Sequence, residues 1–232
     1  LHIFGSQRAQ HQISDVFRKA LKAPAVTVLP QGFGALCLAI STNSALAQGR
    51  VALVDIGSRT TELICFSDGQ YLNHESAGVV LGVGQVYTQV AQKLSSQHQR
   101  QIDAYEVDWA LREDKPIKIK GGVVERQALE TLVQHYVRPL ATRLHNEMTR
   151  LWKEGAPGID HLLYCGGGSA LLASYLGHFR DDYTILPESQ FTNAAGYLEY
   201  IRLTSKDQTR AQDQGAEDTP QGDASAQKAS HA

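Results

Sequence analysis

The sequence predicts an α/β fold in which strands and helices alternate. Short apolar runs of strand length, such as residues 51–56 and 61–66, are interspersed with segments whose apolar residues have helical spacing. A long helical pattern covers residues 123–152. A glycine-rich turn at residues 166–168 joins a strand directly to a helix, which is typical of α/β units.

The composition of the chain argues against two classes of function, direct nucleic-acid binding and membrane attachment. The chain has 232 residues, 42% of them hydrophobic and 20% charged, with a net charge of −2. No block rich in lysine or arginine is present, so we expect no direct binding of nucleic acid. No apolar run approaches the roughly 18–20 residues that span a bilayer, and no signal peptide is recognisable, so we expect a cytoplasmic protein without membrane attachment. Cys37, Cys65 and Cys165 lie far apart, and we expect them to be reduced and buried.

The first fifty residues predict a helix, a strand and a second helix. Residues 13–21 have apolar positions on one helical face, and Pro24 ends the pattern. Residues 25–29 are β-branched and predict a short strand. After the break at residues 30–32, small residues at near-helical spacing favour a closely packed helix over residues 33–40, although a buried strand also fits the run.

The middle of the chain begins with a hairpin. Residues 51–66 contain two apolar strands around a Gly-Ser turn, and residues 71–75 predict a third strand. The glycine-rich run at residues 78–84 predicts a loop, and residues 85–94 predict a helix with one apolar face.

The remaining elements include the longest helix. Residues 116–120 alternate as a strand, whereas residues 105–111 are ambiguous. The helical pattern of residues 123–152 contains Pro139, which either kinks one helix or separates two. Further strands are expected at residues 161–165 and 182–186. Helices are expected to begin at Ser169 and to cover residues 193–203. The segment after residue 204 has little to bury and is expected to be disordered.

The hairpin sequence "VALVDIGSRTTELICF" places a carboxylate and two hydroxyls between buried strands. If this stretch is an ordinary hairpin, Asp55 is there because aspartate favours turns, and the threonines are there because threonine favours strands. However, a carboxylate at the end of an apolar strand is costly without a partner. Hydroxyls and backbone amides beside a carboxylate also suit a phosphate and its Mg²⁺ ion. This stretch alone leaves both interpretations open.

Two further turns are candidate binding segments. In "CGGGS", residues 165–169, glycines would let a ligand approach the backbone at a helix N-terminus, but close helix–strand packing explains them equally well. Gln31 follows Pro30 at a break in the chain. Its carboxamide could orient a water molecule, although such residues are usually solvated loop residues.

Read in order, these motifs resemble the second half of the actin/Hsp70/sugar-kinase superfamily over about residues 25–203. "LVDIGSRTTELICF" is similar to the second phosphate loop of that superfamily and "LLYCGGGSALL" to its adenosine loop. "PQGFGALCLAI" and "FTNAAGYLEYI" resemble its two interdomain hinge helices. The short insertion before the long helix and the F-x-N-A-x-G-Y ending are most similar to the ParM/StbA-type plasmid-segregation actins.

The resemblance implies a ribonuclease-H-like actin fold, a mixed sheet flanked by helices. It implies that residues 1–45 are the end of a first actin-like domain with a hinge helix. Residues 46–203 would be the second, nucleotide-binding domain, with a small insertion at residues 95–122. Residues 204–232 would form a disordered tail.

The resemblance also implies an ATP and Mg²⁺ site. Asp55 would hold Mg²⁺ through water and help to place the attacking water, which Gln31 would polarise. Arg59 would contact a phosphate or point to solvent. The remaining positions would line the nucleotide: Gly57, Ser58, Thr60 and Thr61 at the β- and γ-phosphates, and Gly166, Gly167, Gly168 and Ser169 at the adenosine.

The function implied is a filament-forming ATPase that segregates plasmid DNA through a DNA-binding adaptor protein. The chain begins at Leu1 and has no match to the first phosphate loop, so we expect an N-terminally truncated fragment that is inactive alone. The alternatives are a monomeric small-molecule kinase or chaperone-like ATPase, and a bacterial cell-shape or magnetosome-type actin.

Overall fold

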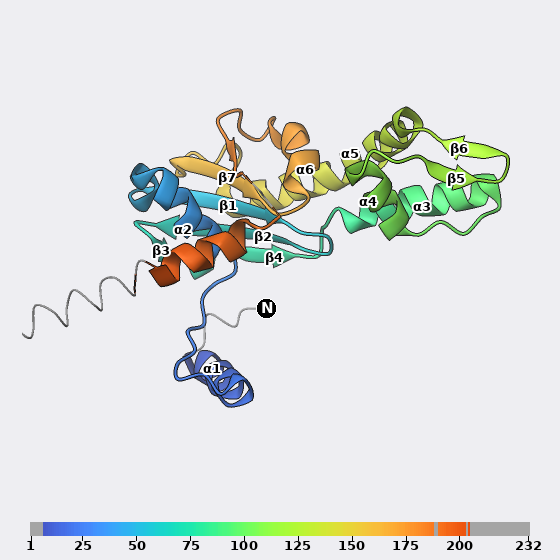
Figure 1. Cartoon of the computed structure of the whole chain (residues 1–232). Coiled ribbons are helices and arrows are strands. Elements are labelled where there is room, and N and C mark those ends of the chain that lie inside the picture. Colours follow the sequence, from blue (N-terminus) through green and yellow to red (C-terminus); the bar gives the residue numbers. More distant parts are fainter. Residues whose placement is uncertain (1–6, 188–189, 203, 205–232) are drawn as a thin grey trace, which may run out of the picture.

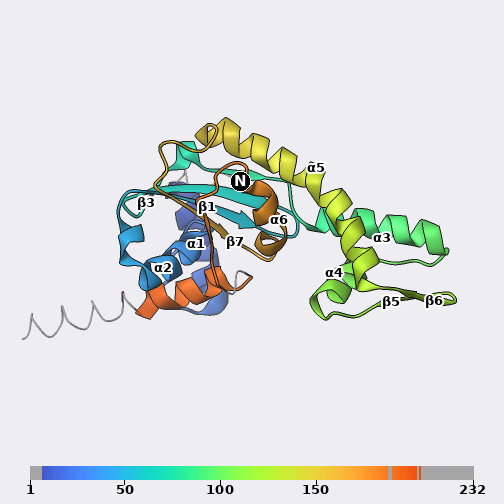
Figure 2. The same ribbon diagram turned by 90° about the horizontal axis from the view of Figure 1, so that it is seen from above.

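A computed structural model describes residues 7–187, 190–202 and 204 (Figure 1). A mixed sheet forms the centre of the molecule, with helices on both faces and a small lobe at one end (Figures 1 and 2). The strands of this sheet are β1 (Arg50–Ile56), β2 (Thr61–Ser67), β3 (Gln70–Tyr71), β4 (Ala77–Val79), β7 (His161–Cys165) and β8 (Thr184–Ile185). The mixed sheet flanked by helices confirms the predicted fold class.

The sheet order is β3-β2-β1-β7-β8, with β4 also paired to β2. β1 and β2 are antiparallel, as expected for the hairpin. β1 is parallel to β7, and β7 is parallel to β8. Asp55 and Cys165 are register partners, so the two candidate turns follow neighbouring parallel strands at the same edge of the sheet.

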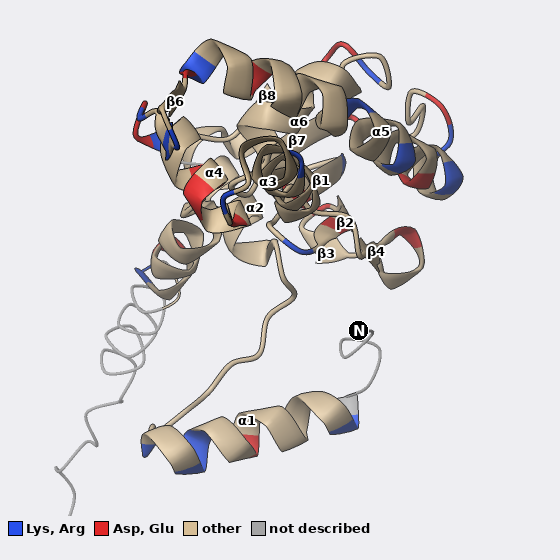
Figure 3. Cartoon of the chain, turned by 90° about the vertical axis from the view of Figure 1, so that its right-hand side faces the viewer, with Lys and Arg blue, Asp and Glu red and all other residues tan. Residues whose placement is uncertain are grey.

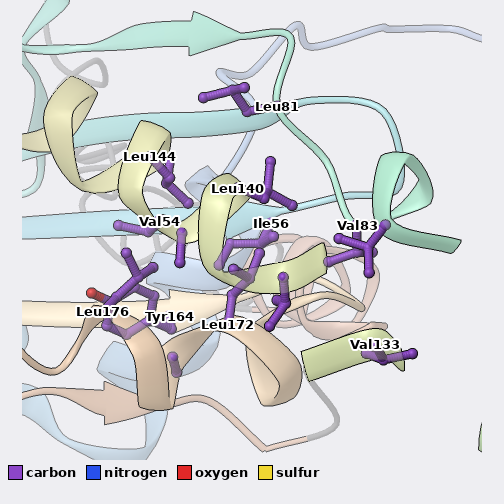
Figure 4. Close-up of a cluster of buried hydrophobic side chains, with 14 of the residues drawn as sticks. Val54, Ile56, Leu81, Val83, Val133, Leu140, Leu144, Tyr164, Leu172 and Leu176 are labelled. Carbon is purple, nitrogen blue, oxygen red and sulfur yellow. The ribbon is translucent and has the colours of Figure 1, made fainter. Parts of the chain in front are cut away.

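Alternation along β1 sends successive side chains to opposite faces of the sheet. On one face, Val54 and Ile56 join a large core with Tyr164, α5 (Arg126–Trp152) and α6 (Ser169–Leu176), part of which Figure 4 shows. On the other face, Val51 and Leu53 pack in a smaller core with α2 (Phe33–Thr42). By the same alternation Asp55 belongs to the α2 face.

The small lobe contains α3 (Gly84–His98), α4 (Ala104–Arg112), β5 (Ile117–Ile119), β6 (Gly122–Val124) and the first part of α5 (Figures 1 and 2). The ambiguous residues 105–111 are helical because Asp103 caps α4, accepting from the Glu106 amide at 2.8 Å. β6 pairs with the expected strand at residues 116–120 in a hairpin that the sequence did not indicate. The predicted start of the long helix at residue 123 is therefore wrong, because residues 123 and 124 belong to β6 and α5 begins at Arg126. Pro139 lies inside one continuous helix.

Two predicted strands are wrong or mostly wrong. Residues 25–29 are extended without strand pairing and link α1 (Gln7–Leu21) to α2, although their composition favours a strand. No sheet edge pairs with them among the described residues, and β-propensity alone does not form a strand. Of residues 71–75, only Tyr71 belongs to β3. Leu72 is extended without strand pairing, and the next three residues form the 3₁₀ turn η3 (Asn73–Glu75).

The last described helix covers residues 192–202 and lies beside α2 on the sheet face that carries Asp55 (Figure 1). α1 stands apart from the sheet at the end of the extended linker (Figure 1). The three cysteines are free, with Cys65 and Cys165 buried and Cys37 half-buried. The predicted disorder of the tail concerns residues 205–232, which lie outside the described part of the chain.

Candidate functional site

Asp55 is nearly buried, with 7% of its surface exposed. The partner that such a carboxylate needs is Asn193, whose Nδ2 donates to Asp55 Oδ2 at 2.8 Å. Gly166 lies against the other oxygen: a Cβ added there would come within 2.5 Å of Asp55 Oδ1. Its φ of +85° also favours glycine. The first two candidate motifs therefore meet at this carboxylate.

Backbone hydrogen bonds connect the turn after Asp55 to the start of α3. The Gly57 amide donates to Thr60 O at 2.9 Å, which closes the turn. The carbonyls of Gly57 and Ser58 accept from the amides of Val83 and Gly84 at 3.1 and 2.9 Å. Gly84 permits this contact, because a Cβ there would lie 2.7 Å from Ser58 Oγ. Sequence reasoning took the run at residues 78–84 as a loop and did not assign it this supporting role.

A hollow of about 490 Å³ opens beside this turn. Gly57, Ser58 and Gly167 contribute to one side of it, so both candidate turns reach the same space. The opposite side comes from the small lobe and includes Tyr87, Tyr105, Asp108 and Arg112. Sequence reasoning missed these lobe residues, because only the fold brings α3 and α4 to the glycine turns.

Gln31 lies in a separate hollow of about 570 Å³ on the α2 side of the hairpin. Thr60 and Glu62 line this second hollow together with Gln31. The turn at residues 57–60 therefore borders both spaces. Gln31 is exposed, and its preceding residue Pro30 is held through its carbonyl, which accepts from Tyr197 Oη at 3.3 Å.

The other predicted site residues divide into exposed and buried groups. Arg59 and Thr60 are exposed on the turn. Thr61 is fully buried, and its hydroxyl donates to Leu81 O at 2.6 Å, which ties the hairpin to the following loop. Gly168 is also buried, and its amide donates to Ile56 O at 2.9 Å.

Ser169 is fully buried at the start of α6, and its Oγ has no hydrogen-bond partner among the described residues. Such orphaned hydroxyls are uncommon in proteins. On the turn, the amides of Ser58 and Arg59 donate to no backbone carbonyl within the described chain. Unpaired amides in a turn can bind an anion.

The charge of Asp55 affects its neighbours. Burial raises the pKa of the Cys165 thiol, and the adjacent Asp55 carboxylate raises it further, so this cysteine is an uncharged thiol near neutral pH. Burial also raises the pKa of Glu62, with a further contribution from Asp55. The pKa of Tyr197 is raised by burial and then by Asp55.

The protein side chains at the turn suit a magnesium ion whose ligands are mostly water molecules and phosphate oxygens. In the described part of the chain, no three histidine, cysteine or acidic side chains cluster as a metal site. Asp55 supplies a carboxylate at the turn, and its register partner Glu62 lies on the neighbouring strand. Mg²⁺ commonly keeps several waters and takes one or two carboxylates plus phosphate oxygens, so a carboxylate beside a phosphate-binding turn fits this chemistry.

The mixed sheet with helices on both faces defines an actin-like domain. The model of the archaeal actin homologue MreB-like C-terminal family matches residues 53–178, and the chain belongs to this family. The predicted kinship with the actin superfamily is therefore confirmed. No curated protein matches the sequence.

Solved structures show the same fold. A pCBH ParM mutant described as non-polymerisable has a TM-score of 0.66 at 22% identity, over 77% of this chain and 55% of its own. A ParM filament from Clostridium botulinum has a TM-score of 0.67 at 19% identity, covering 88% and 64% of the two chains. The archaeal actin homologue Ta0583 in complex with ADP has a TM-score of 0.63 at 22% identity, covering 75% and 56%. The chain thus spans between half and two thirds of these proteins.

Proposed function

We propose that this chain forms one side of a Mg-ATP site. The phosphates would lie at the turn of residues 57–60 and the adenosine at the glycines of residues 166–168. The observation that carries the proposal is the pairing of Asp55 with Cys165 on adjacent parallel strands, which brings both glycine turns to one edge of the sheet. Ligands of open α/β sheets bind outside the carboxyl ends of such strands.

The local chemistry supports this assignment. Ser58 and Arg59 are exposed on the turn, and their amides, which donate to no backbone carbonyl in the described residues, are groups that a phosphate could satisfy. Asp55 would hold Mg²⁺ through water, and the ion would neutralise charge on the phosphates. Gln31, in the hollow shared with Thr60, would orient the attacking water. The reaction is ATP hydrolysis, catalysed by positioning and charge once a second lobe closes the cleft.

We further propose that the whole protein assembles into filaments and acts in plasmid DNA segregation. The fold shared with a ParM described as a filament supports self-association. Basic and acidic residues are interspersed along the chain (Figure 3), which favours an adaptor protein over direct contact with DNA.

Among the described residues, none of the helices has the length and apolar character needed to span a membrane. We propose a cytoplasmic protein whose domains divide near residues 45 and 203, with the insertion at residues 95–122.

Light scattering of the full-length protein with Mg-ATP, with Mg-ADP and without nucleotide tests this proposal. We expect scattering that rises with Mg-ATP and then decays as ATP is hydrolysed. Asp55→Ala should abolish the rise or its decay, because the metal would lose its carboxylate. Asp181→Ala is the matched control, because it removes an aspartate that is exposed to solvent. ATP hydrolysis without scattering at any concentration would instead indicate a monomeric kinase or chaperone-like ATPase.

A further inference from the structure

The helical segment of residues 192–202 crosses α2 at unusually close range. Gly34 lies on α2 and Gly196 on the other helix. A Cβ added to Gly196 would collide with the Gly34 carbonyl oxygen, and one added to Gly34 would collide with the Asn193 carbonyl oxygen. The two backbones are therefore in direct contact, which allows a short side chain on one helix to reach both the other helix and the sheet below it.

Asn193 is that side chain. Its Oδ1 accepts from the Ala35 amide at 3.1 Å, and its Nδ2 donates to Asp55 Oδ2 at 2.8 Å. The two partners fix the orientation of the Asn193 carboxamide, because the backbone N–H of Ala35 can only donate a hydrogen bond and an ionised carboxylate can only accept one. Asn193 thus joins residues 158 and 138 positions away in the sequence.

A second contact one turn along the same helix holds the segment of Gln31. Tyr197 follows Asn193 by four residues, so both side chains lie on one face of the helix. The Tyr197 hydroxyl donates to the Pro30 carbonyl at 3.3 Å, directly before Gln31. One helical face therefore contacts the Asp55 carboxylate, the first turn of α2 and the residue beside Gln31.

We propose that Asn193 is a positioning residue that couples the Asp55 carboxylate to the start of α2, and through it to Gln31. This inference rests on the proposed function, in which Asp55 holds the Mg²⁺ of a nucleotide. If Asp55 held the metal, a movement of its carboxylate would be passed through the Asn193 carboxamide to the first turn of α2. As a neutral donor, Asn193 orients the carboxylate without cancelling the charge that the metal needs.

The test compares the full-length wild-type protein with its Asn193→Ala variant. Calorimetry gives the affinity for ATP with Mg²⁺ and for ATP with EDTA. Hydrogen exchange measured by NMR reports on the Ala35 amide with and without Mg-ATP. Asn146→Ala is the matched control, because Asn146 is exposed on α5. Asn193→Ser, which is too short to reach both partners, replaces the alanine variant if that variant does not fold.

We expect Asn193→Ala to weaken Mg-ATP binding about tenfold, as for the loss of one hydrogen bond to a charged group. Binding of ATP in EDTA should be unchanged, because Asp55 acts only through the metal. A merely structural role would weaken both. In wild type, Mg-ATP should slow exchange at Ala35, and this response should vanish in the variant.

Two results would overturn the inference and are distinguishable. If wild type binds Mg-ATP but the Ala35 amide does not respond, or the variant binds as wild type does, the coupling is refuted while the proposed function stands. If wild type binds no Mg-ATP at all, the proposed function fails and the coupling fails with it.

Discussion

Replacement of Gly196 by alanine tests the close crossing of α2 and the helix of residues 192–202. This helix contacts Asp55 and Pro30, the residue before Gln31. A Cβ at Gly196 would collide with the Gly34 carbonyl oxygen. A backbone oxygen in the middle of packed helices cannot rotate away as a side chain could. The two helices must separate, and separation would disturb Ala35 and Leu36, which are 0% and 1% exposed.

The magnitude follows from two opposing effects. Alanine is favoured over glycine in a helix by about 1 kcal/mol. Overpacking costs about 1–3 kcal/mol, and the upper end applies here because the obstacle is backbone. The net loss of unfolding free energy is then about 2 kcal/mol. For a protein of this size, each kcal/mol lowers the melting temperature by about 2–4 °C, so we expect a decrease of about 4–8 °C.

Thermal unfolding followed by circular dichroism measures this shift. Gly158→Ala is the control, because a Cβ at Gly158 meets no atom within 4 Å. That variant should stay within about 0.5 kcal/mol of wild type. A Gly196→Ala protein as stable as wild type, or more stable, would refute the close crossing, since helix propensity would then be the only effect left.

Three further substitutions test the core and the candidate site. Glu62→Gln should raise the melting temperature at pH 7, because burial raises the pKa of Glu62 and the ionised folded state is penalised above that pKa. The gain should disappear as pH falls below about 4.3, where the carboxyl is protonated in both states, and exposed Glu113→Gln should show no such dependence. Leu144→Ala, at a fully buried site, should cost about 3–4 kcal/mol in denaturant unfolding, and a cost below about 1 kcal/mol would contradict its place in the core. Thr61→Val should cost about 1–3 kcal/mol in the same assay by leaving the Leu81 carbonyl unpaired, whereas unchanged stability would argue against that bond.

Local patterns predicted much of the fold. The hairpin of β1 and β2 and the strand–turn–helix around Gly166 could be predicted because apolar runs and turn residues act over a few positions. The same reasoning failed for residues 25–29, where strand composition has no sheet edge to pair with. β6 was also missed, because its hairpin depends on packing of the small lobe.

The candidate site was predictable in part for the same reason. The carboxylate at the end of β1 signalled that Asp55 needs a partner, but nothing local identified Asn193, which lies 138 positions away. Thr61 was predicted beside the phosphates from its place in the motif, yet its hydroxyl is engaged by Leu81. Tyr105 borders the hollow only because α4 folds across from the glycine turns.

A crystal structure of the full-length protein with Mg-ADP would show directly whether Asp55 and the two glycine turns form a nucleotide site. We expect the phosphates against the turn of residues 57–60, with Mg²⁺ linked through water to Asp55. We expect the nucleoside in the hollow that Gly167 and Tyr105 border. A nucleotide bound elsewhere on the chain, or this edge of the sheet left unchanged at saturating Mg-ADP, would contradict it.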